Sequence, residues 1–396
     1  AGLSVVNISS RVMLAHLKGK LEVVGRVPVD NRAALSTLYT PGVAEVCMAI
    51  HHDPEKAHTL TIKGTTILVV SDGTRVLALG DIGPRAAMPV MEGKAMLFKR
   101  FGNVNAVPIC LDTKDPEEII RTVKLISPGY GGVNLEDIAS PGCYEIERRL
   151  QAELDIPVFH DDRHGTAVVV GAAAINAAKL VNKPLGKMKA VCIGTGAAGL
   201  TCIQMLYDLG LRNILAFNSA GVVHKDRTDL TSEEQWLLKH SNRRNFKGSL
   251  EKALQGADLV LGLSVAGTIK PEWLKGMNKD GIVFALANPI PEVLPAEASK
   301  SVRVIATGGS YYANQINNAL AFPGIFRGLL DGRVAKVTEE MKIEAARALA
   351  AVVKADELDD DYIIPSVFNT QVAPAVANAI MTVAQRSGLA RRTPKS

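Results

Sequence analysis

The chain has 396 residues, more than a single hydrophobic core usually holds, so two domains are expected. Hydrophobic residues make up 47% of it and charged residues 21%, and the formal net charge is only +5. Because no basic face is interleaved with aromatic residues, nucleic acid is not an expected partner. The five cysteines are scattered and form no Cys-x-x-Cys pair, which favours reduced thiols in a cytoplasmic protein over disulfides or zinc ligands.

We also expect no membrane attachment. The most apolar run, residues 166–181, is too short to cross a bilayer and contains Asn176 and Lys179. The start of the chain has no signal-peptide pattern. Both observations fit a cytoplasmic location.

The first part of the chain alternates apolar runs with helical patterns. We expect strands at residues 66–71, 105–111, 132–135 and 157–160. Helices are expected at residues 43–51, 89–101, 116–126 and 141–154. An alanine-rich helix that is apolar on all sides is expected at residues 166–181, buried between two layers. This alternation predicts an α/β domain with a parallel sheet over residues 1–164.

The second part begins with a β-α-β pattern. A strand at residues 189–193, a glycine turn at 194–199, a helix at 200–209 and a strand at 212–217 follow one another. Further strands are expected at 258–263, 281–287 and 302–306, and closing helices at 339–353 and 373–386. Continuous apolar strands are typical of parallel sheets buried on both faces. We therefore expect a Rossmann-type, doubly wound dinucleotide-binding domain with closing C-terminal helices over residues 165–396.

The glycine turn lies between a strand and a helix, where a phosphate-binding loop belongs. Its residues are Gly194, Thr195, Gly196, Ala197, Ala198 and Gly199. The glycines permit a tight turn and close approach to a pyrophosphate, and the helix N-terminus offers free N–H groups. This motif predicts a nicotinamide dinucleotide as cofactor.

The residue that should distinguish NAD from NADP is uncharged. Asn218 ends the second strand of the β-α-β unit, where an acidic residue would bind the adenosine ribose. Nearby Lys225 and Arg227 could meet the extra phosphate of NADP, or they could simply be solvated surface cations. The choice between the two cofactors stays open.

Two acidic pairs predict a metal site. Glu136-Asp137 and Asp161-Asp162 each follow an expected strand, at the carboxyl end where open α/β sheets bind their ligands. Isolated acidic pairs are usually exposed surface, but two pairs at this edge favour a cation with oxygen ligands, Mg²⁺ or Mn²⁺.

Proton-transfer candidates lie upstream of these carboxylates. Lys94 stands among glycine, alanine and methionine, where burial could lower its pKa toward that of a base, although a lysine can also extend to solvent. Tyr39 precedes a proline-initiated helix and could donate a proton, or be an ordinary tyrosine. His160 and His164 flank the second acidic pair and are expected to hydrogen-bond rather than bind the metal.

Together these segments resemble the malic enzymes, in particular the short prokaryotic-type form, over nearly the whole chain. Besides the glycine loop, the motifs are YTPGVA at residues 39–44, SDG at 71–73, LGDIG at 79–83, PVMEGK at 89–94, NLEDI at 134–138, HDD at 160–162, ANPIPE at 287–292 and NNALAFPG at 317–324. The resemblance implies oxidative decarboxylation of (S)-malate to pyruvate and CO₂ with reduction of NAD or NADP. It also implies a homodimer.

The resemblance assigns roles residue by residue. It implies that the metal ligands are Glu136, Asp137 and Asp162. It implies a general base at Lys94, a general acid at Tyr39 and a carboxylate at Asp161 that supports the base. The substrate would be bound by Arg75, Asn288 and Asn318. The cofactor would be bound by the glycine loop, Thr166, Asn218, Ser264 and Asn288.

Several positions depart from the family pattern, among them Ala78, where the family usually has glycine. Arg163 stands where the family usually has glutamine, and Gly309 and Tyr311 replace an arginine and an aspartate expected near the nicotinamide. Two alternatives therefore accompany the main hypothesis. One is a malolactic-type enzyme that releases lactate, and the other is a nucleotide-binding relative without catalysis.

Overall fold

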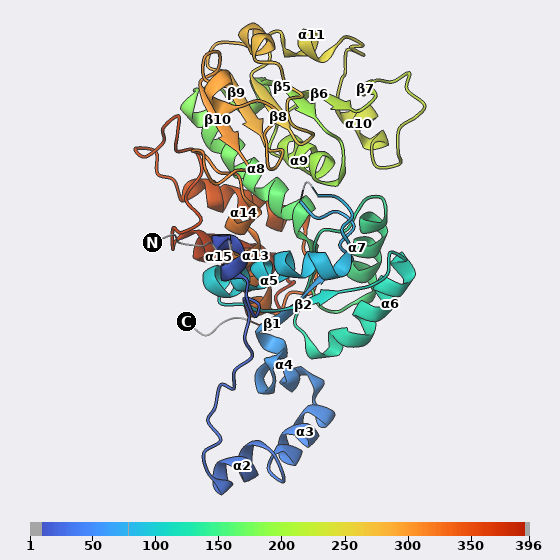
Figure 1. Cartoon of the computed structure of the whole chain (residues 1–396), viewed down its shortest axis with the longest axis vertical. Helices are drawn as coiled ribbons and strands as arrows, with labels where there is room; N and C mark the ends of the chain where they lie inside the picture. Colours follow the sequence, from blue (N-terminus) through green and yellow to red (C-terminus); the bar gives the residue numbers. More distant parts are fainter. Residues whose placement is uncertain (1–9, 78, 393–396) are drawn as a thin grey trace, which may run out of the picture.

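The computed structural model describes residues 10–77 and 79–392, and two sheets organise it (Figure 1). The first sheet has the order β2-β1-β3-β4 and is wholly parallel. Its strands are β1 (Thr66–Ser71), β2 (Asn105–Cys110), β3 (Val133–Leu135) and β4 (Val158–His160). All four match the predicted strands within one residue or so at their ends.

The second sheet has six strands in the order β10-β9-β8-β5-β6-β7. They are β5 (Lys189–Ile193), β6 (Asn213–Asn218), β7 (Gly221–Val222), β8 (Leu259–Gly262), β9 (Ile282–Ala285) and β10 (Val304–Thr307). All pairings are parallel except that of β6 with the short β7. The chain reverses its direction of winding at β5, which lies between β6 and β8, and this creates the crevice where such folds bind dinucleotides. The predicted doubly wound sheet is confirmed.

The strands are apolar on both faces because helices cover both sides. In β1, Ile67 and Val69 belong to one buried cluster, whereas Leu68 and Val70 belong to another. The first sheet packs with α5 (Gly83–Gly102) and α7 (Gly142–Glu153), and α6 (Pro116–Ile126) packs on α7. The remaining shorter helices are α1 (Arg11–Ala15), α4 (Ala57–Leu60), α10 (Gln235–His240), α11 (Leu250–Leu254) and α12 (Pro295–Ala298).

Three helices begin three or more residues earlier than predicted. Helix α5 starts at Gly83 rather than at Pro89, which lies inside it, because Pro84 in the first turn provides the helix start. Helix α8 (Asp161–Leu180) starts five residues before the predicted 166, so the second acidic pair occupies its first turn. Helix α9 (Ala197–Asp208) starts within the glycine loop rather than after it.

Helix α8 joins the two sheets. Most of its residues are buried, as predicted from its apolar surface, and it packs against α9 and α14 (Glu339–Ala351). The last helices return to the first sheet: α13 (Phe322–Gly332) and α15 (Val372–Arg386) both contact α5. The Phe98 and Phe322 ring centroids lie 4.5 Å apart at this junction. All five cysteines are free, as predicted.

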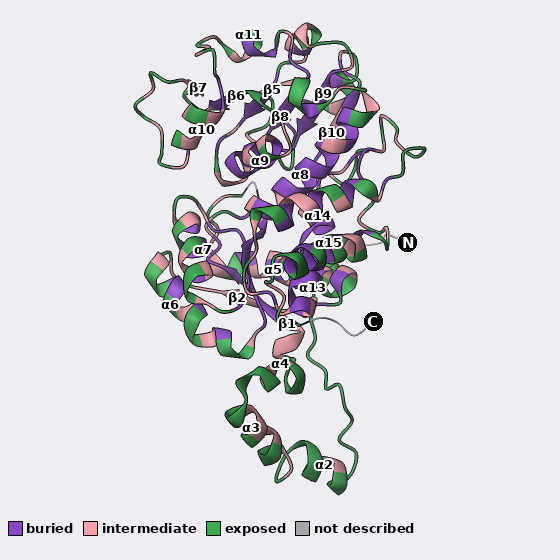
Figure 2. Ribbon diagram, turned by 180° about the vertical axis from the view of Figure 1, so that it is seen from behind, coloured by how far each residue is buried: buried purple, intermediate pink, exposed green. Residues whose placement is uncertain are grey.

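Helices α2 (Arg32–Leu38) and α3 (Val43–His52) form an arm that projects from the body (Figures 1 and 2). We call residues 32–52 the N-terminal arm. Neither helix has a buried residue. Even the apolar side chains of Leu35, Leu38 and Met48 are exposed. By length and composition alone, this segment could cross a membrane. Its apolar surface is without cover in the single chain.

Candidate active site

The two acidic pairs meet at one edge of the first sheet. Strands β3 and β4 pair in parallel with Leu135 opposite His160, so the residues that follow them emerge side by side. The structure therefore brings Glu136-Asp137 and Asp161-Asp162 together, because carboxyl ends of parallel strands share an edge.

Three of these carboxylates can surround one cation. One oxygen each from Glu136, Asp137 and Asp162 lies within 4.8 Å of the others, and this is the one such acidic group within residues 10–77 and 79–392. The Asp137 N–H donates to Asp162 Oδ2 at 2.8 Å, and Asp137 Oδ2 is buried without a hydrogen-bond partner. Burial and the neighbouring carboxylates raise the pKa of Asp137 to about 7 and that of Glu136 well above its usual value. A divalent cation fits this oxygen donor set. It would give Asp137 Oδ2 a partner and lower the raised pKa values of Glu136 and Asp137.

Lys94 is buried against the same cluster, with 7% of its surface exposed. Its Nζ lies 2.5 Å from Asp161 Oδ2 and 2.7 Å from Glu136 Oε1, and 4.2 Å from the Phe322 ring centroid. Burial lowers the pKa of Lys94, but the charges of Asp161 and Glu136 outweigh it and raise the pKa above its ordinary value. The expected lowering of the Lys94 pKa is therefore wrong for the metal-free chain, because the sequence did not show how close the carboxylates would be.

Asp161 is fully buried, and burial raises its pKa to about 6 despite the neighbouring Lys94. Gly165, one turn later in α8, leaves room for this carboxylate, since a Cβ there would lie 1.8 Å from Asp161 Oδ1. The same Cβ position is 3.4 Å from the Cβ of Asn318, so Asn318 borders this part of the cluster. Thr166 follows Gly165 in α8 and is half-buried.

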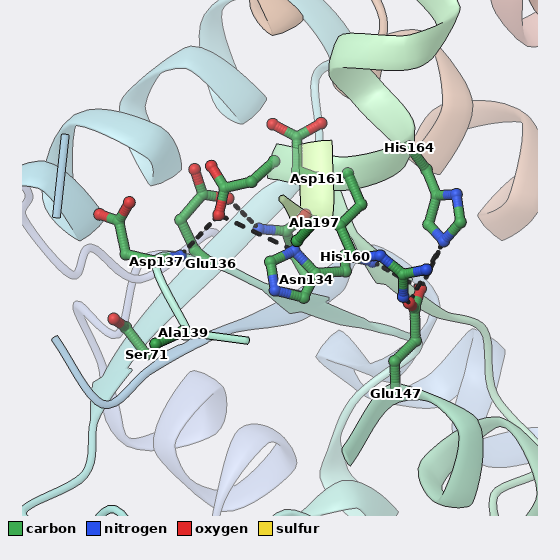
Figure 3. A network of polar contacts seen from close by, with 12 residues as sticks. Ser71, Asn134, Glu136, Asp137, Ala139, Glu147, His160, Asp161, His164 and Ala197 are labelled. Atoms are coloured by element: carbon green, nitrogen blue, oxygen red, sulfur yellow. Dashed lines mark hydrogen bonds and ion pairs between the residues drawn. The ribbon is translucent and has the colours of Figure 1, made fainter. Parts of the chain in front are cut away.

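Arg163 turns away from the carboxylate cluster. Its guanidinium pairs with Glu147 of α7 and lies over the Tyr144 ring, 4.5 Å from the centroid. Glu147 also accepts from His160 N at 3.0 Å and lies 3.0 Å from His164 Nε2 (Figure 3). Burial opposes ionisation of Glu147, but His164 and Arg163 outweigh it and hold its pKa well below the usual range. Glu147 was not predicted as a site residue, because nothing near it in the chain marks it as buried.

The two histidines differ in their contacts. The Nδ1 of His164 lies 3.0 Å from Lys342 Nζ, so both of its ring nitrogens have polar neighbours. The ring nitrogens of His160 are buried without a hydrogen-bond partner, and only its backbone N–H contacts Glu147. The predicted hydrogen-bonding role fits the His164 ring.

The glycine loop has the conformation that a phosphate site needs. Gly194 has φ 102°, and a Cβ there would lie 2.3 Å from the carbonyl oxygen of Leu263. Gly196 is exposed, with no atom within 4 Å of a Cβ placed on it, and it is the N-cap of α9, which has no side-chain cap. Free N–H groups thus face open space at the start of α9, which suits a pyrophosphate. Ala197 packs against the buried cluster of the first sheet, so this loop and the carboxylate site lie on adjoining surfaces.

A buried glutamate organises the loops beyond β8 and β9. Glu292, fully buried, accepts from Ser264 N at 2.7 Å and from Ala287 N at 3.0 Å. It thereby fixes Ser264 and the segment that leads to Asn288, whose side chain lies next to Gly308. Glu292 ends the ANPIPE motif, but its place in the chain does not predict this role.

Some of the predicted site residues have exposed side chains within one chain. Tyr39 follows α2 in the N-terminal arm and is 67% exposed. Arg75 donates its backbone N–H to the Asp137 carbonyl, and it is exposed. Tyr311 is 95% exposed, and nothing in the structure explains the departures at Gly309 and Tyr311.

The fold and the site define a class of enzyme: a dinucleotide-dependent oxidoreductase with a carboxylate site for a divalent cation beside a buried lysine. Comparison with known proteins narrows that class. The model of the malic enzyme N-terminal domain matches residues 18–151, and that of the malic enzyme NAD-binding domain matches residues 164–385. The chain belongs to the malic enzyme family and is an NAD- or NADP-dependent enzyme of that family.

Individual relatives agree along nearly the whole chain. The NAD-dependent malic enzyme of Geobacillus stearothermophilus is 56% identical, over 99% of this chain and 82% of the relative. The bifunctional malic/malolactic enzyme of Bacillus subtilis is 49% identical, over 95% and 92%. The crystal structure of malic enzyme from Pyrococcus horikoshii superposes with a TM-score of 0.90 at 46% identity, over 95% of this chain and 89% of that one.

Proposed function

We propose that this protein oxidatively decarboxylates (S)-malate to pyruvate and CO₂ and passes the hydride to NAD or NADP. The observation that carries the proposal is Lys94, buried between Asp161 and Glu136 at the rim of the carboxylate cluster. A base, a cation site and a dinucleotide loop on adjoining surfaces are the parts that this reaction needs.

Glu136, Asp137 and Asp162 would hold Mg²⁺ or Mn²⁺. The unpartnered Asp137 Oδ2 and the raised pKa values of Glu136 and Asp137 support this assignment, since both are relieved by a cation. When bound, the ion supplies Lewis-acid stabilisation of negative charge that develops on substrate oxygens.

Lys94 would accept the proton of the C2 hydroxyl as the hydride leaves. Its raised pKa keeps it protonated in the metal-free chain, so its function as a base depends on positive charge that offsets the carboxylates. Asp161 would hold the Lys94 ammonium in place through the 2.5 Å contact. Asn318, close to Asp161, and Asn288 and Arg75 would bind malate, and Thr166 and Ser264 would border the cofactor.

A second copy of the chain would supply Tyr39 as the general acid that protonates C3 of enolpyruvate. Tyr39 lies in the N-terminal arm, which projects from the body and has no buried residue. Its apolar side chains, Leu35 and Leu38 among them, need a cover, and a symmetric dimer can cover both arms with identical contacts. We therefore propose a cytoplasmic homodimer in which each arm reaches the partner's carboxylate cluster.

Product analysis tests the reaction itself. Purified protein with malate, Mn²⁺ and NAD or NADP should accumulate the reduced dinucleotide and pyruvate in equal amounts. No reduction with either dinucleotide would overturn the proposal. Lactate without net reduction would identify the malolactic reaction, which is the second candidate because the Bacillus subtilis relative is named bifunctional. Dinucleotide binding without any conversion of malate would identify a non-catalytic relative.

A further inference from the structure

A carboxylate from a distant segment lies between the glycine loop and the end of β6. Glu234 is only 7% exposed, and its Oε1 accepts from Thr195 Oγ1 at 2.5 Å and from Asn218 Nδ2 at 3.0 Å. Thr195 is the second residue of the loop, and Asn218 is the last residue of β6. Glu234 therefore touches both segments that frame the adenosine side of the dinucleotide crevice.

Helix capping explains only half of this arrangement. Thr231 N donates to Glu234 Oε2 at 3.1 Å, and Glu234 N donates to Thr231 Oγ1 at 3.2 Å, the reciprocal pattern of a capping box before α10. That role occupies Oε2 and requires neither burial nor contact with the glycine loop. The other oxygen, Oε1, is directed to the cofactor crevice.

Glu234 carries a negative charge at neutral pH. Burial raises its pKa, but the hydrogen bonds from Thr195, Asn218 and Thr231 outweigh burial and hold the pKa below its usual value. Asn218, the residue at the position where an acidic side chain usually meets the ribose, is thus backed by an anion from another segment.

The nearest cation is already engaged. Arg227 donates to Asn218 Oδ1 at 2.7 Å and forms a two-point pair with Asp229, with Nε–Oδ1 at 2.8 Å and Nη2–Oδ2 at 2.5 Å. The carboxylate of Asp229 occupies the Nε–Nη2 edge of the guanidinium, which could otherwise bind a phosphate through two hydrogen bonds. Arg227 is therefore poorly placed to favour NADP.

We propose that Glu234 is the specificity-determining residue that makes this enzyme prefer NAD to NADP. Its negative charge next to Asn218 and Thr195 is compatible with the uncharged ribose hydroxyls of NAD and repels the additional phosphate of NADP. Asp229 offsets the positive charge of Arg227. The inference rests on the proposed function, which places a dinucleotide on this loop. Like charges brought together at a binding site typically disfavour the wrong ligand strongly.

Binding measurements separate this inference from the catalytic proposal. Titration calorimetry of the full-length protein with NAD and with NADP, without malate, should give tighter binding of NAD by about 10-fold or more. Glu234→Gln keeps the capping bond, since glutamine serves in a capping box, and removes the charge. It should tighten NADP by about 10-fold and change NAD by less than about threefold.

Glu233→Gln is the matched control, because it removes the same charge one residue away, where the side chain accepts from Ser232 Oγ. It should leave both affinities unchanged. Asp229→Asn, on the exposed side of Arg227, should also tighten NADP, and it serves as a second test should Glu234→Gln fold poorly. If the wild-type protein binds NADP as tightly as NAD, or if folded Glu234→Gln leaves the ratio of the two affinities unchanged, the inference is overturned; where Glu234→Gln does not fold, an unchanged ratio in Asp229→Asn overturns it. If neither nucleotide binds, the proposed function fails with it.

Discussion

Two inactive variants, mixed, should regain activity if Tyr39 acts across a subunit boundary. Lys94→Ala removes the base from the body of the chain, and Tyr39→Phe removes the acid from the N-terminal arm. In a mixed dimer, one site would lack both groups, whereas the other would combine the intact Lys94 of one chain with the intact Tyr39 of its partner. Random reassociation of equal amounts makes half of the dimers mixed, each with one of two sites intact, so about one quarter of wild-type activity should return.

The assay is the initial rate of dinucleotide reduction after the two variants are dissociated and reassociated together. Each variant treated alone should stay inactive. Lys94→Ala mixed with Asp161→Asn is the matched control, because both defects lie in the body and neither mixed site would be complete. Restoration in this control, or none in the first mixture, would refute the arrangement in which the arm serves the partner.

Three further results follow from the site. Lys94→Ala should lower kcat by about 10²–10⁴-fold while the dinucleotide still binds, and unchanged turnover would remove Lys94 from the role of base. Mn²⁺ should raise the Tm more at about pH 8 than at about pH 5.5. The pKa of Asp137 is about 7 when folded and near 3.8 when unfolded, so the folded metal-free state binds more protons in between and loses stability as pH rises. Bound metal would remove this loss of stability at high pH. A rise in Tm on Mn²⁺ addition that is the same at both pH values would contradict the prediction. Arg163→Gln should lower the free energy of unfolding by ~1–3 kcal/mol, because the buried Glu147 loses its charged partner. The affinity for Mn²⁺ should change little. A Mn²⁺ affinity that falls together with stability would place Arg163 at the metal instead.

The sequence predicts the sheets well because most of their strands are buried on both faces, whereas β2 is half-buried along its length. Such strands consist of continuous apolar runs, and all strands of the first sheet were found where those runs lie. The same logic places the acidic pairs, because residues that follow adjacent parallel strands must emerge at one edge. The sequence therefore carries the location of the carboxylate cluster before any contact is known.

Contacts between segments that are distant in the chain could not be predicted from the sequence. The pKa of Lys94 depends on the distances to Asp161 and Glu136, so its direction could not follow from the neighbours of Lys94 in the chain. Glu147, Glu234 and Glu292 gain their importance from burial against other segments. Helix α13 was also missed, because its regularly spaced glycines lower helix propensity, yet they let α15 approach: a Cβ on Gly328 would lie 2.6 Å from the Ala377 carbonyl oxygen.

The return of the last helices to the beginning of the chain limits how these enzymes can be recombined. Gly102, at the end of α5, lies so close to α13 that a Cβ on it would be 2.6 Å from the Pro323 carbonyl oxygen. A hybrid that exchanges only the dinucleotide sheet between two relatives should therefore take residues 322–386 from the parent that contributes α5. A single crossover after α8 would join surfaces of α5 and α13 that were fitted in different proteins, whereas two crossovers, before β5 and after β10, would keep the contacts of α5 with α13 and α15 within one lineage.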